Sequence, residues 1–405
     1  MRPLVIVLSV LLVISAIGLA PHTALGQVDF NTNTPQPTDV LDTFSFATNT
    51  PAGPTATPTP TATPTATNTP TPTPIPLGPY TYPTGINPLT GLPYPSEEAQ
   101  ARRNLIVKIS NFPPEVRPQS GVNAADLVYE YEVEGGVTRF AAIFRNNAPD
   151  HVGPIRSARL LDMELVVMYR ALLAYSGTSE PIQDLLLSQD WRWQLFSPSV
   201  GYNCEQAGFC RFPEEGKAFE HTLYGDTSKI WEMATLQGVN TGYRAYGFAF
   251  DETPNAGGEE ANELFINWWG QTNALWQYDP ETERYVRFTD GLPHYDAADG
   301  EQLWADNLII IEAPHNRRPD LFPEGSNYES LEIALWDGGR ALVARNGRIY
   351  QGFWQRPNRN EGAALIILDD DGTPIMLKPG RSWVSIVRGL GTVDIRTDYS
   401  DMAAT

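Results

Sequence analysis

The feature that most limits how this chain can fold is a Thr- and Pro-rich tract at residues 31–76, which contains the run TATPTPTATPTATNTPTPTP. The tract offers almost no apolar surface to bury, so it cannot build a hydrophobic core. Its recurring prolines favour an extended polyproline II conformation. We therefore expect residues 27–80 to form a disordered linker and the folded body to begin near Tyr80.

The N-terminal residues 1–26 have the pattern of a secretory signal peptide. Arg2 precedes an apolar run that extends to Ala20, and the segment ends in the small-residue sequence ALG. An uncleaved membrane anchor is the alternative, because the apolar run is almost long enough to span a bilayer. The cysteine that would carry a lipid anchor is missing after this run. The segment predicts export to the extracellular space or the cell-envelope surface.

The sequence contains two cysteines, Cys204 and Cys210. Export places them in an oxidising environment, so we expect a disulfide between them. Two free thiols are one alternative. A metal site is another, but it would need more ligands than the single nearby histidine, His221. We therefore expect no metal centre.

The charge of the chain limits its partners. A formal net charge of -20 argues against a nucleic acid or an anionic membrane surface, because both require a basic face. The basic residues are nevertheless concentrated in one region. Residues 101–170 contain nine Lys and Arg against eight Asp and Glu, so this region is close to neutral while the rest of the chain is acidic.

The pattern of apolar residues predicts an α+β fold with two lobes, of which the first is mixed α/β and spans residues 81–255. Its helices should begin near Ser157, and within residues 179–189 and 226–238. Its strands are expected at residues 104–109, 126–133, 136–144 and 171–177.

The second lobe should be mainly antiparallel β and spans residues 256–396. The polar, Gly-rich sequence TPNAGGEEAN connects it to the first lobe. Turn residues at Asp337-Gly338-Gly339 and Asn346-Gly347 indicate two hairpins. Strand-forming sequences occur within residues 274–288, 307–313, 330–354, 364–377 and 382–388.

The common catalytic signatures are absent from the sequence. It has no G-x-S-x-G, S-x-x-K or H-E-x-x-H motif, no phosphate-binding Walker loop and no G-x-G-x-x-G after a strand. We therefore predict no cofactor and leave open whether the protein is an enzyme. Among the histidines, His294 and His315 are expected on surface loops, whereas His221 lies just before a predicted helix and is the better functional candidate.

An arginine set is the strongest functional signal. Two of its members lie at a predicted helix start, where the positive end of the helix dipole makes a cation unfavourable unless an anion is near. Guanidinium groups and the backbone N–H groups near Ser157 could jointly bind a carboxylate or a phosphate. The set consists of Arg117, Arg139, Arg156 and Arg159. In the alternative, the arginines are neutralised internally by Asp126, Glu130, Glu132 and Glu134.

An ordered series of motifs resembles the YerB-like family of predicted bacterial lipoproteins. The motifs are NPLTGLP (87–93), RPQSG (117–121), AADLVYE (124–130), VEGGVTRF (133–140), GPIRSAR (153–159), HTLYG (221–225) and PGRSWVSIV (379–387). The resemblance implies an exported, two-domain protein that faces the cell envelope, without an assigned activity. Thr222 stands where the family has asparagine. The motif positions fall on Arg117, Glu130, Arg139, Arg156, Ser157, Arg159, His221 and Tyr224.

We expect a binding module for an anionic envelope component, such as a wall polymer or a peptide carboxylate. Its ligand-binding residues would be Arg117, Arg139, Arg156, Ser157, Arg159 and Tyr224. One alternative is a glycan- or peptidoglycan-acting enzyme, with Glu130 or Glu134 as acid/base and His221 assisting. The other is a scaffold that binds envelope proteins and no small ligand.

Overall fold

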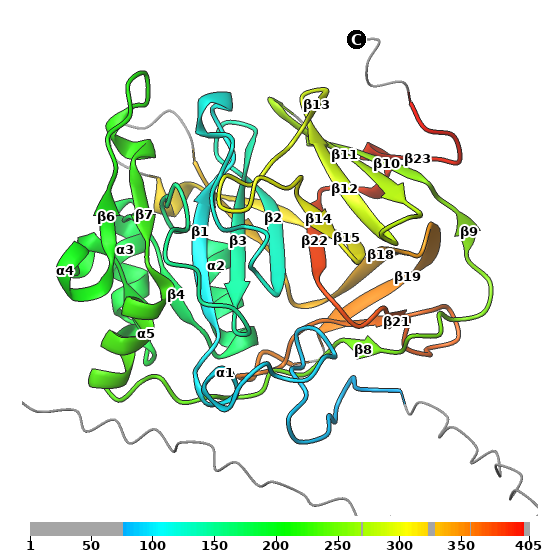
Figure 1. The fold of residues 1–405 in the computed structure, drawn as a ribbon, viewed down its shortest axis with the longest axis horizontal. Coiled ribbons are helices and arrows are strands. Elements are labelled where there is room, and N and C mark those ends of the chain that lie inside the picture. Colours follow the sequence, from blue (N-terminus) through cyan, green and yellow to red (C-terminus); the bar gives the residue numbers. More distant parts are fainter. Residues whose placement is uncertain (1–75, 269, 323–328, 357, 401–405) are drawn as a thin grey trace, which may run out of the picture. The chain divides into compact units, whose positions relative to one another are not determined.

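The architecture is built around one long β-sheet, which is visible in Figure 1. The computed structural model describes residues 76–400 except 269, 323–328 and 357. The predicted signal peptide and almost all of the predicted linker lie outside the described residues. Within the described part of the chain, no helix is long and apolar enough to cross a membrane.

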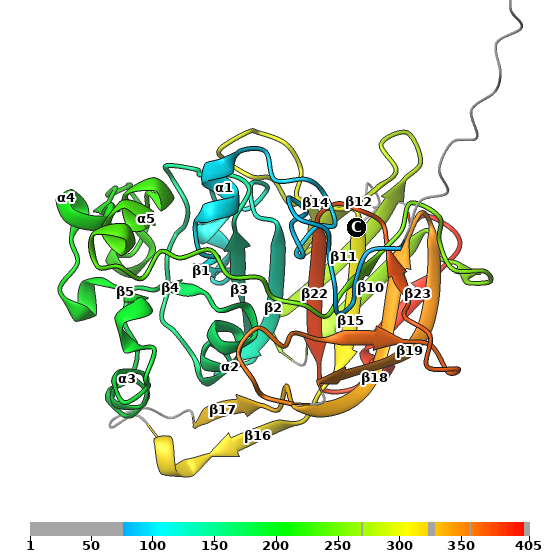
Figure 2. The ribbon, with the colours of Figure 1, turned by 90° about the horizontal axis from the view of Figure 1, so that it is seen from below.

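The long sheet has 11 strands in the order β20-β19-β18-β15-β22-β2-β3-β1-β4-β5, with β9 paired to β19. Strands from the two halves of the chain meet at its centre, where β22 (Ser382–Val387) pairs in parallel with both β15 (Asn307–Glu312) and β2 (Leu127–Val133). Figure 2 shows these strands side by side. The two halves therefore share a sheet in addition to being connected through residues 253–262.

The N-terminal region mixes helices and strands, as predicted. Its strands are β1 (Leu105–Ser110), β2, β3 (Val137–Phe144), β4 (Leu172–Ala174), β5 (Leu195–Phe196), β6 (Phe209–Arg211) and β7 (Leu223–Gly225). Its helices are α1 (Glu97–Ala101), α2 (Leu160–Tyr169), α3 (Glu180–Leu187), α4 (Cys204–Ala207) and α5 (Thr227–Leu236). Short 3-10 helices include η1 (Pro114–Val116) and η4 (Phe219–His221).

Helix α2 begins later than predicted, because tertiary contacts hold the residues before it in an extended form. The N-cap is Arg159 and not Ser157. The Ala158 N–H donates to the Gly177 carbonyl at 3.0 Å, so it is bonded outside the helix. The Arg159 N–H donates to the Asp162 carboxylate at 2.7 Å, which satisfies one of the free donors at the helix start.

The C-terminal region is mainly antiparallel β, as predicted. A second sheet runs β13-β12-β11-β10-β23, with β14 on β12. Its strands are β10 (Glu263–Trp268), β11 (Thr272–Asp279), β12 (Arg284–Thr289), β13 (Leu292–Pro293), β14 (Trp304–Ala305) and β23 (Val393–Arg396). The remaining strands are β8 (Ala249–Phe250), β9 (Glu259–Glu260), β15, β16 (His315–Arg318), β17 (Ser330–Ile333), β18 (Asp337–Arg345), β19 (Arg348–Arg356), β20 (Ile366–Leu368), β21 (Met376–Leu377) and β22.

One of the two hairpin turns predicted for the second lobe is present. Asn346 and Gly347 join β18 to β19 with φ of 52° and 68°, the left-handed values that this turn requires. The prediction for residues 337–339 was wrong, because these residues are the first part of β18 and pair with β19. Gly339 serves close packing there, since a Cβ would lie 2.4 Å from the Glu312 carbonyl oxygen.

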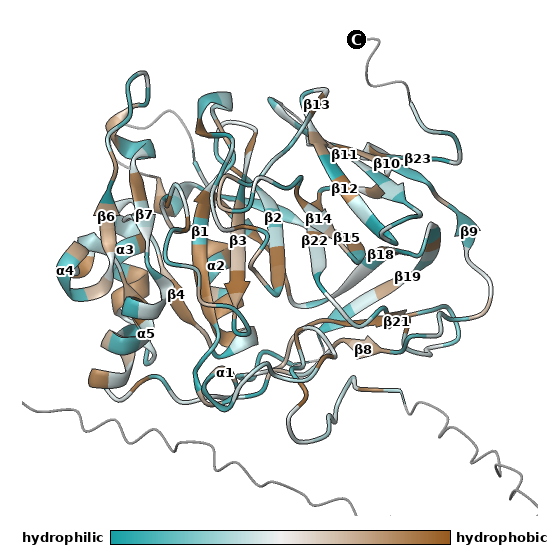
Figure 3. Ribbon diagram, viewed as in Figure 1, coloured by the Kyte–Doolittle hydropathy of each residue, from teal (hydrophilic) through white to brown (hydrophobic). Residues whose placement is uncertain are grey.

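Apolar side chains cover both faces of the long sheet, and Figure 3 shows this concentration on β1, β3 and α2. One face packs on α2 through residues such as Ile106, Tyr129 and Leu165. The opposite face packs on α5 and on the second sheet, where Trp383 meets Trp276 edge-on at 5.0 Å between ring centroids. Since β2 contributes to both cores, a polar side chain on β2 needs a partner within the protein.

The predicted disulfide between Cys204 and Cys210 is present and links α4 to β6. It closes a loop with a sequence separation of 6 residues. Short loops of this kind restrict the unfolded chain less than long ones do.

We expect the double variant Cys204→Ser, Cys210→Ser to lower the free energy of unfolding by about 2 kcal/mol, which is the chain-entropy contribution of a small loop. Urea unfolding followed by tryptophan fluorescence measures the difference. The oxidised and reduced wild-type proteins serve as matched references, and the reduced protein should unfold like the variant. Equal unfolding midpoints for all three would contradict the expectation.

Candidate functional site

Three of the four arginines in the predicted set come together at the start of α2, and we call Arg139, Arg156 and Arg159 the α2 cation cluster. The Arg139 guanidinium, on β3, donates to the Ser157 carbonyl at 2.8 Å. Burial lowers the pKa of Arg139 well below its usual value, and the positive charges of Arg159 and Arg156 lower it further. The three charges are therefore close enough to repel one another.

The carboxylates do not balance this cluster. Glu134 forms an ion pair with Arg159. Among the described residues, no Asp or Glu lies within ion-pair distance of Arg139 or Arg156. Arg139 is only 9% exposed, and among the described residues the Arg156 guanidinium has a single hydrogen bond, from Nη1 to the Glu220 carbonyl at 3.3 Å. A buried positive charge without a counter-ion is costly, so this imbalance needs an explanation.

Sequence reasoning missed a fourth cation below the cluster. Lys108 lies on β1, is fully buried, and pairs with Asp162 of α2 at 3.1 Å. Burial lowers the pKa of Lys108 to about 8, although Asp162 opposes this shift. The signal in the sequence is a lysine inside the otherwise apolar strand NLIVKI. Asp162 forms an ion pair with Lys108 and accepts a hydrogen bond from the Arg159 N–H. It therefore does not neutralise the positive charge of Arg139 or Arg156.

His221 lies beside the cluster, in η4. Its side chain is 4% exposed and its Nδ1 has no hydrogen-bond partner among the described residues. Burial lowers the pKa of His221, and the positive charge of Arg156 lowers it further. Ser157 contributes its carbonyl to Arg139 and does not cap the helix with its hydroxyl.

Tyr224 has a different environment from the cluster. Its ring stacks on His151 with 4.1 Å between centroids and 10° between planes. Both residues line a separate pocket with Asp150, Glu214 and Lys217. Within the described residues, no hydrogen bond or cation–π contact joins Tyr224 to the arginines of the predicted set.

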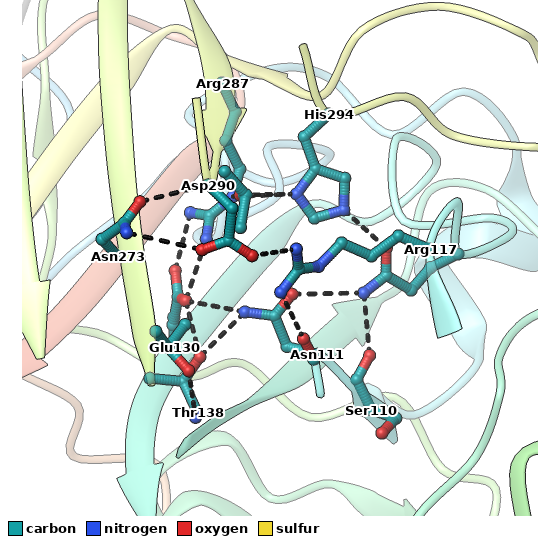
Figure 4. Close-up of polar contacts among 12 residues, drawn as sticks. Ser110, Asn111, Arg117, Glu130, Thr138, Asn273, Arg287, Asp290 and His294 are labelled. Atoms are coloured by element: carbon teal, nitrogen blue, oxygen red, sulfur yellow. Dashed lines mark hydrogen bonds and ion pairs between the residues drawn. The ribbon is translucent and has the colours of Figure 1, made fainter. Parts of the chain in front are cut away.

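Arg117 is the arginine that does not join the cluster. It follows η1, and its Nη1 lies 2.5 Å from the Asp290 carboxylate, in the turn between β12 and β13 (Figure 4). Its Nη2 donates to the Asn111 carbonyl at 3.1 Å. Arg117 is thus part of a contact between the two halves of the chain.

Glu130 is held in a buried polar network, which Figure 4 shows. Its carboxylate accepts two hydrogen bonds from Arg287 of β12, at 2.7 and 2.9 Å, and neither side chain is exposed. Three further side chains donate to it at 2.9 to 3.2 Å: Asn111, Thr138 and Trp383. A carboxylate with all these partners and no access to solvent is not placed to exchange a proton with a substrate.

His294 belongs to the same network, and its expected surface position was wrong. It is 3% exposed, because the β12–β13 hairpin folds it inward against β3. Its Nε2 lies 2.6 Å from Gln119 Oε1, and its Nδ1 lies 2.9 Å from Thr289 Oγ1. Burial and the charges of Arg287 and Arg117 lower its pKa well below the usual value, so His294 is neutral. His315, on β16, is partly exposed.

A cavity of about 370 Å³ lies beside this network, and we call it the proline pocket. Its polar residues come from the network and from the ion pair of Arg117 and Asp290. Its lining consists of Pro114, Arg117, Pro118, Thr289, Asp290, Leu292, Pro293, His294 and Tyr295. In the described part of the chain, no group of three or more His, Cys, Asp or Glu could hold a metal ion.

We expect Glu130→Gln to lower the free energy of unfolding by about 3 to 5 kcal/mol, because it leaves Arg287 buried without a counter-ion. Chemical denaturation measures this loss. The matched control is Glu132→Gln on the same strand, whose partner Arg388 is 37% exposed. It should cost about 1 kcal/mol or less. Equal losses in the two variants would contradict the structural role of Glu130.

The comparisons with known proteins cover most of the described chain. Residues 89–240 match the family described as "Protein of unknown function (DUF3048) N-terminal domain", and residues 264–384 match its C-terminal domain. The chain is 27% identical over 312 residues to "Putative lipoprotein YerB" of Bacillus subtilis (strain 168), covering 76% of this chain and 88% of that protein.

A crystal structure of YerB from Bacillus subtilis resembles this one with a TM-score of 0.64 and 25% sequence identity. The match covers 77% of this chain and 99% of that chain. It supports the resemblance to YerB-like proteins that the motifs indicated. Because both domains are present in order and span more than half of the chain, this protein belongs to the DUF3048 family.

Proposed function

We propose that the protein is an exported, cell-envelope-associated binding module that holds an anionic group at the α2 cation cluster. Its similarity to a protein named as a lipoprotein supports a location at the cell envelope. The signal-peptide pattern of residues 1–26 supports the same location.

The observation that carries the proposal is the excess of guanidinium groups over carboxylates. Arg139 is almost fully buried and has a backbone carbonyl, not a carboxylate, as its hydrogen-bond partner. A phosphate or carboxylate from a ligand would supply the missing negative charge and accept hydrogen bonds from two arginines at once. The positive end of the dipole of α2 favours the same anion.

The catalytic alternative has no comparable support. Glu130 is enclosed by Arg287 and other donors, and none of its hydrogen bonds among the described residues is to His221. Glu134, the other acid/base candidate, is paired with Arg159. The geometry therefore favours binding over proton transfer.

We expect inorganic phosphate to raise the melting temperature of the wild-type protein more than that of Arg156→Gln. A ligand that binds only the folded state stabilises it by an amount that grows with the logarithm of the ligand concentration, about 2.7 kcal/mol at 100 times the dissociation constant. Arg156 is half-buried and its guanidinium makes one long hydrogen bond within the described residues, so loss of this side-chain charge should leave the fold intact.

Phosphate also stabilises proteins non-specifically, so the comparison needs a matched variant. Arg192→Gln removes an exposed arginine that lies outside the cluster. The melting temperature of Arg192→Gln should rise with phosphate as much as that of the wild type. Calorimetric titration should show phosphate binding to Arg192→Gln and to the wild type. Equal phosphate responses in Arg156→Gln and the wild type would refute the proposal. Acetate, titrated in parallel, shows whether a carboxylate can replace phosphate.

A second variant tests the charge imbalance without any ligand. Arg139→Met replaces a buried cation with an apolar side chain of similar length, so the ligand-free protein should keep or gain stability. The same variant should lose its response to phosphate. Denaturant unfolding at low salt measures the first effect. A loss of several kcal/mol would show that Arg139 is already neutralised within the fold.

A further inference from the structure

The proline pocket combines apolar walls with one ion pair. Its walls come from Pro114, Pro118 and Pro293, with Leu292 and Tyr295 at its exposed part. Its volume of about 370 Å³ is within the range of small-molecule sites. Sites of this kind bind through apolar contacts and use a few polar groups to select the ligand.

The floor of the pocket offers few free polar groups. Both ring nitrogens of His294 have partners, at Gln119 and Thr289. The Thr289 hydroxyl also lies 3.2 Å from Arg287 Nε. Selection of a ligand therefore falls to Arg117 and Asp290.

Both members of this ion pair are held in place by other contacts. Asp290 lies in the β12–β13 turn with φ of 52°, and its N–H donates to Asn273 at 3.1 Å. Arg117 is fixed by its bond to the Asn111 carbonyl. The pair is nevertheless accessible, since the two side chains are 14% and 37% exposed. Ion pairs with this much solvent exposure contribute little to stability, so a charged ligand can replace either partner.

We propose that the proline pocket binds a free α-amino acid with an apolar side chain. The ligand carboxylate would pair with Arg117 in place of Asp290. The ligand ammonium group would pair with Asp290 in place of Arg117. This exchange breaks one ion pair and forms two. A ligand with only a carboxylate or only an ammonium group leaves Asp290 or Arg117 without its partner, so the zwitterion is favoured.

The apolar side chain of the ligand would occupy the space between the prolines and Leu292. Burial of each methylene group there contributes through the hydrophobic effect, whereas glycine gains nothing from these walls. The proposal does not depend on the α2 cation cluster, because the two sites use different arginines.

Isothermal titration calorimetry with L-leucine, N-acetyl-L-leucine and L-leucinamide tests the proposal on the full chain. L-leucine should bind, and each blocked compound should bind at least about tenfold more weakly, because each lacks one charged hydrogen-bonding group. Glycine should bind more weakly than leucine. Equal affinities for leucine and its two blocked forms would overturn the proposal, as would the absence of leucine binding.

Variants locate the binding in the pocket. Asp290→Asn keeps a residue that tolerates positive φ, so the turn should be retained while the charge is lost. It should weaken leucine binding by about tenfold or more. The matched control is Asp337→Asn, at another exposed aspartate with positive φ, of 66°. Leucine binding that is unchanged in Asp290→Asn would overturn the proposal, whereas Asp337→Asn should bind leucine like the wild type.

Discussion

The bidentate pair of Glu130 and Arg287 is the interaction on which the arrangement of the two halves depends. A carboxylate on a strand with both faces buried can be tolerated only if its charge and lone pairs are satisfied inside the protein. Arg287 reaches it from β12, a strand of the second sheet, and Trp383 of β22 donates to the same carboxylate. One residue thus fixes the second sheet against the centre of the first.

The two candidate sites, the proline pocket and the α2 cation cluster, differ in their balance of charge. At the proline pocket, Arg117 has a carboxylate partner, and His294 is neutral and fully bonded, so the local charge is balanced. At the α2 cation cluster, Arg159 is the one of three arginines that forms an ion pair with a carboxylate among the described residues. A balanced site favours a ligand that is itself neutral overall, whereas an unbalanced site favours an anion.

The sequence predicted the local structure well and the long-range pairing poorly. Apolar patterning identified β1 to β3 because strands buried on both faces give continuous apolar runs. It placed the start of α2 too early, because the Ala158 N–H bonds to Gly177 through tertiary structure. The alternative, in which carboxylates neutralise arginines of the same region, holds for Glu134 with Arg159, whereas Glu130 and Glu132 pair with arginines 157 and 256 residues away. Periodicity carries no information about such distant partners.

The central position of β22 has a consequence for how the chain acquires its structure. Residues 382–387 supply the strand that covers the edge of β2, so that edge stays open until these residues have been synthesised. An uncovered strand edge is a template for aggregation. Loss of residues 382–387 would therefore damage both halves of the fold, because β22 pairs with β2 of one half and β15 of the other.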